Sequence, residues 1–148
     1  MMPIPMKWFS ALFFLLCVCL TGRAQQGDAL IAGSGGGFTG MVNAYKIFAD
    51  GKVYKGKGMT EIQYTECAKI RKAKARKLVR RATQTLNDAG ELNAPGNQYY
   101  FITTVQSGKE NKATWGAADR PVPYALKDLY HEVQGMVTGL TYSPIPIP

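Results

Sequence analysis

The dipeptide Asp50-Gly51 constrains the fold more than any other feature of the sequence, because it separates two runs of β-forming residues. Strand-like runs joined by two turn residues of this kind predict a β-hairpin. We therefore expect antiparallel strands at residues 41–48 and 52–57. A fold of parallel strands would need a long crossover, usually a helix, at this point, and the sequence leaves no room for one.

A glycine-rich run precedes the hairpin, with the sequence GSGGGFTG at Gly33–Gly40. It contains the spacing G-x-G-x-x-G, which binds dinucleotides when the glycines end a strand and begin a helix whose N-terminus holds the phosphates. Here a predicted strand follows the glycines, and no Gly-Lys-Ser/Thr follows to make a P-loop. The run therefore predicts a glycine-rich hairpin or bulged loop, and we expect no nucleotide and no other cofactor.

Hydrophobic periodicity supplies the remaining elements. A short apolar run at 30–32 predicts a first strand, and alternation predicts strands at 99–105 and 110–115 around the turn Ser107-Gly108. Helical spacing predicts a helix at 66–88 with Thr65 as N-cap, ending near Gly90, and a second helix at 123–137. The order β-β-β-α-β-β-α predicts an α+β single domain: an antiparallel sheet of about four to five strands with two helices packed on it.

The N-terminal segment resembles a targeting signal. Lys7 precedes an apolar run at 8–20, and the small residues Gly22 and Ala24 occupy the positions before a cleavage site. A membrane anchor or a buried helix is the alternative, but the run is shorter than the roughly 20 residues that span a bilayer. We therefore predict a signal peptide at 1–24, export to the periplasm or the medium, a domain at 28–140, and a disordered, proline-rich tail at 141–148.

Cleavage at this point would change the charge and the cysteine content. Removing Lys7 and Arg23 leaves 16 basic and 10 acidic residues, a net charge of about +6. Cys67 would remain as the single cysteine, so no internal disulfide is expected. It is interpreted as a small core residue, with a reactive thiol or an intermolecular disulfide as the alternatives.

The sequence contains few candidates for catalytic residues. His131 is the only histidine, the carboxylates are scattered, and no serine lies in a nucleophile-elbow motif. We expect neither a catalytic residue nor a metal site, and predict that the chain is not an enzyme. The aromatic residues Tyr99, Tyr100, Phe101 and Trp115 are interpreted as packing residues, with stacking on sugars or bases as the alternative.

A basic segment lies in the first predicted helix. Eight basic residues and no acidic ones fall between Lys69 and Arg81. They form either a solvated outer face or a patch for an anionic partner, such as lipid headgroups, polysaccharide or an acidic protein. We take Lys72, Arg76 and Arg80 as the candidate patch; export and the lack of a base-reading motif argue against nucleic acid.

Four segments are spread over residues 33–137: SGGGFTG, AGELNAPG, QYYFITTVQSGKENKATWG and RPVPYALKDLYHEV. Together they resemble the emfourin family. Those small proteins share a Gly-Gly-Phe opening, a central helix, a strand pair and a proline-led last helix. The chain differs in its third glycine, its leader and its basic helix. The resemblance implies a protein inhibitor of thermolysin-like metalloproteases.

The residues that match the family's opening loop are Gly36, Gly37, Phe38, Thr39 and Gly40. This loop is the candidate partner-binding site, in which Phe38 either reaches an apolar subsite of a protease or folds back onto the core. The alternative function is an envelope-associated structural or interaction protein whose basic helix contacts anionic surfaces.

Overall fold

Strand β1 (Ala29–Gly36) runs through the centre of a seven-stranded sheet with the order β4-β3-β2-β1-β6-β7-β5. Neighbouring strands are antiparallel, except that the short edge strand β5 pairs in parallel with β7. The other strands are β2 (Val42–Phe48), β3 (Lys52–Gly58), β4 (Gln63–Lys69), β5 (Leu92–Ala94), β6 (Gln98–Gln106) and β7 (Lys109–Trp115).

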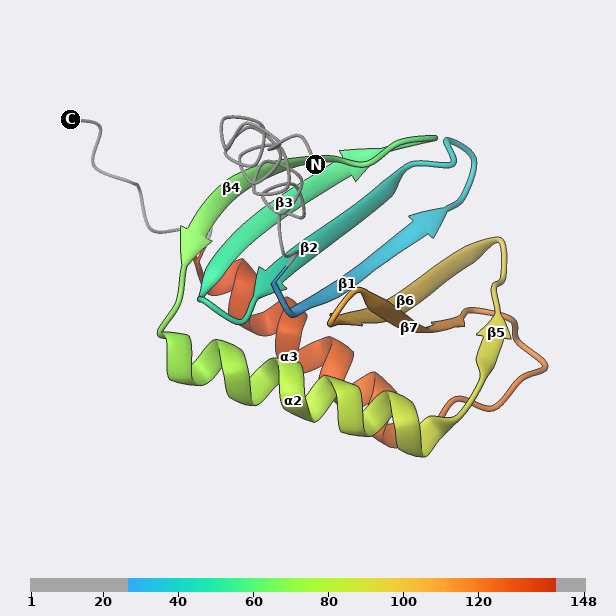
Figure 1. Cartoon of the computed structure of the whole chain (residues 1–148). Coiled ribbons are helices and arrows are strands. Elements are labelled where there is room, and N and C mark those ends of the chain that lie inside the picture. Colours follow the sequence, from blue (N-terminus) through green and yellow to red (C-terminus); the bar gives the residue numbers. More distant parts are fainter. Residues whose placement is uncertain (1–26, 141–148) are drawn as a thin grey trace, which may run out of the picture.

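This arrangement comes from a computed structural model, which describes residues 27–140 (Figure 1). The predicted α+β class and single domain are confirmed, although the sheet has more strands than expected. The predicted signal peptide at 1–24 and the proline-rich tail at 141–148 lie outside the described residues. Within those residues, neither helix has the length and apolar content needed to cross a bilayer.

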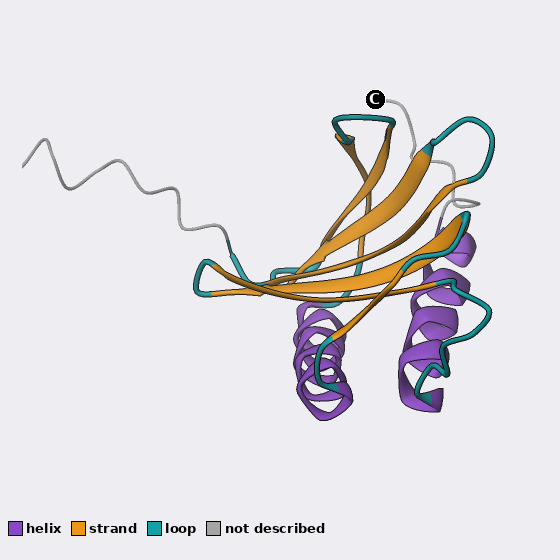
Figure 2. Ribbon diagram, turned by 90° about the vertical axis from the view of Figure 1, so that its right-hand side faces the viewer, coloured by secondary structure: helices purple, strands orange, loops and turns teal. Residues whose placement is uncertain are grey.

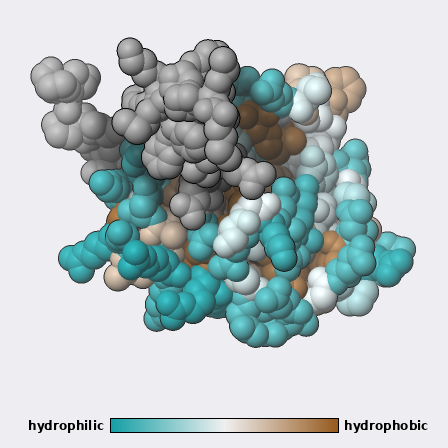
Figure 3. Space-filling model, viewed as in Figure 1, coloured by the Kyte–Doolittle hydropathy of each residue, from teal (hydrophilic) through white to brown (hydrophobic). Residues whose placement is uncertain are grey.

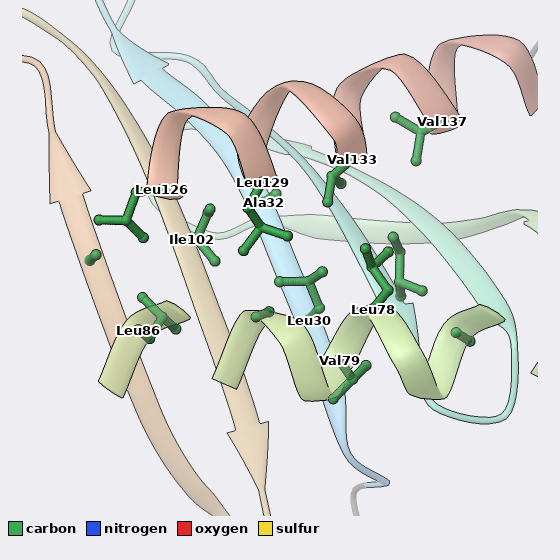
Figure 4. Packing of buried hydrophobic residues seen from close by; sticks show 14 of the residues in the cluster. Leu30, Ala32, Leu78, Val79, Leu86, Ile102, Leu126, Leu129, Val133 and Val137 are labelled. Atoms are coloured by element: carbon green, nitrogen blue, oxygen red, sulfur yellow. The ribbon is translucent and has the colours of Figure 1, made fainter. Parts of the chain in front are cut away.

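Both helices lie against the same face of the sheet. Helix α2 (Lys72–Ala89) and helix α3 (Tyr124–Leu140) run side by side beneath it (Figures 1 and 2). Their apolar faces meet side chains from the central strands to form the main core (Figure 4). The fully buried side chains include Leu30, Ile47, Leu86, Ile102, Leu126, Leu129 and Val133.

The two predicted hairpins are confirmed. Asp50-Gly51 turns the chain between β2 and β3, and the Asp50 side chain accepts a hydrogen bond of 3.0 Å from the backbone N–H of Lys52. Ser107-Gly108 turns it between β6 and β7, where both residues have positive φ. The last helix also lies where it was predicted and extends a few residues further.

The predicted start of the first helix is wrong. Residues 63–69 form the edge strand β4, and helix α2 begins at Lys72 rather than at 66. Thr65 therefore pairs with Lys55 of β3 and caps no helix. The helical spacing at the start of this segment does not decide its structure. Without β4, the backbone N–H and C=O groups on the outer edge of β3 would have no strand partner, and residues 63–69 form backbone hydrogen bonds with them. A bulge next to Val53 leaves Cys67 as the extra residue.

The expectation that the glycine run forms a loop is also partly wrong. Gly33, Gly35 and Gly36 belong to the central strand, and only residues 37–40 form the turn to β2. Neighbouring strands explain the glycines at positions 33 and 35. A Cβ added at Gly33 would lie 2.5 Å from the carbonyl oxygen of Asn43 and 2.7 Å from the ring of Phe101. A Cβ at Gly35 would lie 2.6 Å from the Tyr99 hydroxyl. The two rings thus cover the glycine positions on the face away from the helices.

We predict opposite effects of alanine at two glycines. Gly33→Ala should lower the free energy of unfolding by about 1–3 kcal/mol, because the new methyl group overpacks against backbone and ring. Gly135→Ala should raise it by about 0.5–1 kcal/mol, because this helical glycine is exposed and has open space around it. Urea denaturation of both variants checks the signs, and a Gly33→Ala variant as stable as the parent would contradict the packing described.

Candidate functional site

The turn between β1 and β2 is tied to its surroundings by hydrogen bonds. The N–H of Gly37 donates to the carbonyl of Asn97 at 2.7 Å, and the N–H of Gly40 donates to the carbonyl of Gly37 at 3.3 Å. The N–H of Met41 donates to the hydroxyl of Thr39 at 3.4 Å. Gly37 has φ +71°, a conformation that glycine adopts without strain. The candidate loop Gly36–Gly40 is therefore a hydrogen-bonded turn beside the start of β6.

Phe38 at the tip of this turn is fully exposed, with a relative exposure of 106%. It does not fold back onto the core. Met59, at the tip of the β3–β4 hairpin, is 65% exposed. Because Val42 pairs with Gly58, both tips lie at the same end of the sheet. In Figure 3 a light-brown area lies among pale and hydrophilic residues at the upper right of the molecule.

The basic residues of the segment Lys69–Arg81 are all exposed. Within the described part of the chain, only Arg81 forms ion pairs, with Asp128 at 2.8 Å and with Glu132, both on α3. The other cations of the segment have no anionic partner there. The ion pairs of Arg81 join the two helices at their exposed surface, where each contributes little to stability.

Lys72, Arg76 and Arg80 lie on one row of α2, because residues four apart are neighbours on a helix surface. The helix packs into the core through Ala75, Leu78, Val79, Ala82 and Leu86, and the row lies along one flank of this buried face. Figure 3 shows hydrophilic residues over the lower part of the molecule, where α2 lies. Arg76 and Arg80 line a shallow pocket together with Asp28, Ala49 and Gln106, so this part of the candidate patch borders the end of the sheet.

The aromatic residues singled out in the sequence divide between the two faces of the sheet. Phe101 and Tyr99 cover the glycines of β1 on the open face, and Phe101 is 6% exposed. Tyr100 and Trp115 are register partners on the helix face, and Trp115 is 5% exposed. Packing is thus the main role of Phe101 and Trp115, since little of either ring is left for stacking on a ligand.

The described residues bring no metal-binding group of side chains together. No three His, Cys, Asp or Glu side chains among them gather closely enough to hold a metal ion. His131 is exposed on α3, whereas Cys67 is half-buried on β4, the strand at one edge of the sheet. The Cys67 thiol donates to the carbonyl of Val53 at 3.5 Å, and burial raises its pKa above the ordinary value.

Sequence reasoning missed a basic-rimmed cavity at the start of α3. Arg120, Lys127 and His131 line it together with aromatic side chains. The spacing of Lys127 and His131, four residues apart on a predicted helix, was a visible signal. The sequence contains no such signal for Arg120, because this residue lies in an irregular segment whose path depends on the tertiary fold.

The comparisons with known proteins return no match, either among protein-family models or among curated proteins. The likeness to the emfourin family therefore depends on the four motifs quoted above.

We predict that Cys67 reacts slowly with alkylating reagents. A raised pKa lowers the fraction of thiolate, which is the reacting form, at any pH below it. In a Cys17→Ser/Cys19→Ser chain, iodoacetamide at pH 8 should modify Cys67 several-fold more slowly than it modifies glutathione. The same chain unfolded in urea serves as control and should react at the ordinary rate; equal rates in both states would contradict the burial effect.

Proposed function

We propose that this chain is an exported, non-enzymatic binding module that inhibits a thermolysin-like metalloprotease through the turn Gly36–Gly40. The single observation that carries the proposal is the full exposure of Phe38. Burying a phenylalanine side chain is worth roughly 1.5–3 kcal/mol, and this stabilisation is left unused in the free protein. A partner with an apolar pocket can recover it on binding.

The turn presents Phe38 in an ordered setting. Its backbone hydrogen bonds to Asn97 and within the turn fix its shape before any partner binds. Such preorganisation lowers the entropic cost of association. Aromatic anchors on a rigid support are typical of the residues that dominate binding energy at protein interfaces.

Met59 enlarges the apolar surface beside the turn. Its hairpin ends at the same edge of the sheet and is linked to the β1–β2 hairpin by the β2–β3 ladder. A partner that receives Phe38 can therefore contact Met59 as well. An interface with one aromatic anchor and a flanking apolar side chain fits the exposed surface here.

We predict that Phe38→Ala abolishes most of the inhibition. Loss of a central aromatic anchor costs about 2–4 kcal/mol of binding energy, which corresponds to roughly 30- to 1,000-fold in the inhibition constant. The measurement is the inhibition constant of purified protein against a thermolysin-like metalloprotease. Thermal unfolding of the variant should be unchanged, because Phe38 makes no core contact.

Tyr124→Ala is the matched control, since Tyr124 is a second aromatic residue with 81% exposure but lies at the start of α3. It should inhibit as well as the parent protein. Absence of inhibition by the parent at micromolar concentration would refute the inhibitor function. Equal inhibition by the Phe38→Ala variant would refute the role of the turn.

The unpaired cations of α2 support a second candidate function, contact with an anionic envelope surface. Lys72 and Lys74 lie in the first turn of the helix, which contains no acidic residue. Cations at a helix N-terminus interact unfavourably with the helix dipole, by about 0.3–1 kcal/mol each. An anionic surface would offset this cost, and the exposed side chains of Lys72, Arg76 and Arg80 are available to contact one.

We predict that a Lys72→Gln/Arg76→Gln/Arg80→Gln chain binds acidic lipid vesicles more weakly than the parent. Each cation near such a surface contributes about 1 kcal/mol, so the triple variant should lose on the order of 100-fold. Co-sedimentation with phosphatidylglycerol vesicles at low salt measures this. A Lys52→Gln/Lys57→Gln/Lys109→Gln chain has the same net charge and controls for charge alone. An equal loss in both variants would mean that α2 provides no specific patch.

A further inference from the structure

A cavity of about 480 Å³ opens beside the first turns of α3. One wall is the segment 116–122, which leads from β7 to the helix, and another is the helix itself. The floor consists of Tyr100 from β6 and Trp115 from β7. The segment is fixed at its start, where the N–H of Ala117 donates to the carbonyl of Ala94 at 3.0 Å.

Three aromatic side chains build the inner part of the cavity. The rings of Tyr100 and Trp115 are stacked at 6.2 Å, and Tyr130 meets them edge-on, at 5.4 Å from Tyr100 and 5.7 Å from Trp115. Tyr100 and Tyr130 are only half-buried, so parts of both rings remain accessible. Burial raises the pKa of Tyr130 above the ordinary value for tyrosine.

The rim of the cavity is basic. Arg120 and Lys127 line it with His131, and no acidic side chain does. The carboxylates of Asp128 and Glu132 on the same helix bind Arg81 of α2 instead. Within the described residues, Arg120 and Lys127 form no ion pair, so both are available to an anion.

We propose that this cavity binds a small ring compound that carries a carboxylate. The ring lies against the accessible parts of Tyr100 and Tyr130, and the carboxylate lies between Arg120 and Lys127. The volume is within the range of small-molecule pockets, about 300–1,000 Å³. A guanidinium binds a carboxylate with two parallel hydrogen bonds, and an ammonium adds a point charge. The site is separate from the Phe38 turn and does not depend on the proposed function.

Two kinds of compound share this chemistry: aromatic carboxylates and acidic sugars. Benzoate and glucuronate are the probes for them, with benzamide and methyl glucoside as neutral counterparts. Trp115 reports binding, because it lies in the cavity floor and the chain has only one other tryptophan, Trp8. Titrations therefore use the full chain with the substitution Trp8→Phe, followed by tryptophan fluorescence.

We expect a saturable fluorescence change with at least one carboxylate, at a concentration about 10-fold or more below that of its neutral counterpart. Arg120→Gln and Lys127→Gln should each weaken binding by about 10-fold. Arg71→Gln is the matched control, an exposed arginine without an ion pair that lies outside the cavity, and should bind like the parent. Unchanged thermal unfolding of all three variants shows that the fold is intact.

Saturation by benzoate alone assigns the site to aromatic carboxylates, and saturation by glucuronate alone assigns it to acidic sugars; either supports the proposal. Binding of a neutral counterpart as tight as that of its carboxylate overturns it. So does binding that is unchanged by both cavity substitutions, or the absence of any saturable change up to millimolar concentrations of both carboxylates.

Discussion

The close packing of the central strand β1 against its two neighbours supports the rest of the structure. On the helix side, Leu30 and Ala32 of β1 are fully buried in the main core. On the other side, the Phe101 ring and the backbone of Asn43 lie so close to Gly33 that a methyl group would not fit there. On its open face the strand carries Ile31 but no side chain at Gly33 and Gly35, and the rings of Phe101 and Tyr99 cover these two positions. Of the glycines with the phosphate-binding spacing, Gly35 is thus a packing position, whereas Gly37 and Gly40 have open space around them and positive φ in the turn.

The same strand positions the candidate partner-binding turn. Gly36 pairs with Gln98 at the end of β1, and the chain leaves the ladder at Gly37, still hydrogen-bonded to Asn97. The turn therefore begins on the most supported strand of the sheet, and Phe38 projects from a stable base. Phe38 and Met59 leave two large apolar side chains exposed at this end of the sheet, and the core accounts for neither.

Charge is distributed unevenly over the helices. The carboxylates of α3 that approach α2 are bound by Arg81, which leaves the remaining cations of the Lys69–Arg81 segment facing solvent. On the other side of α3, Lys127 and His131 meet Arg120 around an aromatic floor. The two basic surfaces differ in kind. One is a row of exposed cations along a helix flank, and the other is a cavity with an aromatic floor, of a size suited to a single small anion.

The sequence by itself determined the α+β class, both two-residue hairpins, the end of α2 near Gly90 and the last helix, because turn chemistry and hydrophobic period are local properties. It also predicted a turn within the glycine run, although Gly36 belongs to β1 and the turn covers residues 37–40, and it showed the run of basic residues. Only the tertiary structure decided that residues 63–69 form a strand, since the free edge of β3 competes with local helical spacing. It alone placed Phe38 in solvent and brought Arg120, Lys127 and the aromatic floor together. Those outcomes depend on which distant segments pack side by side, and no local pattern encodes that.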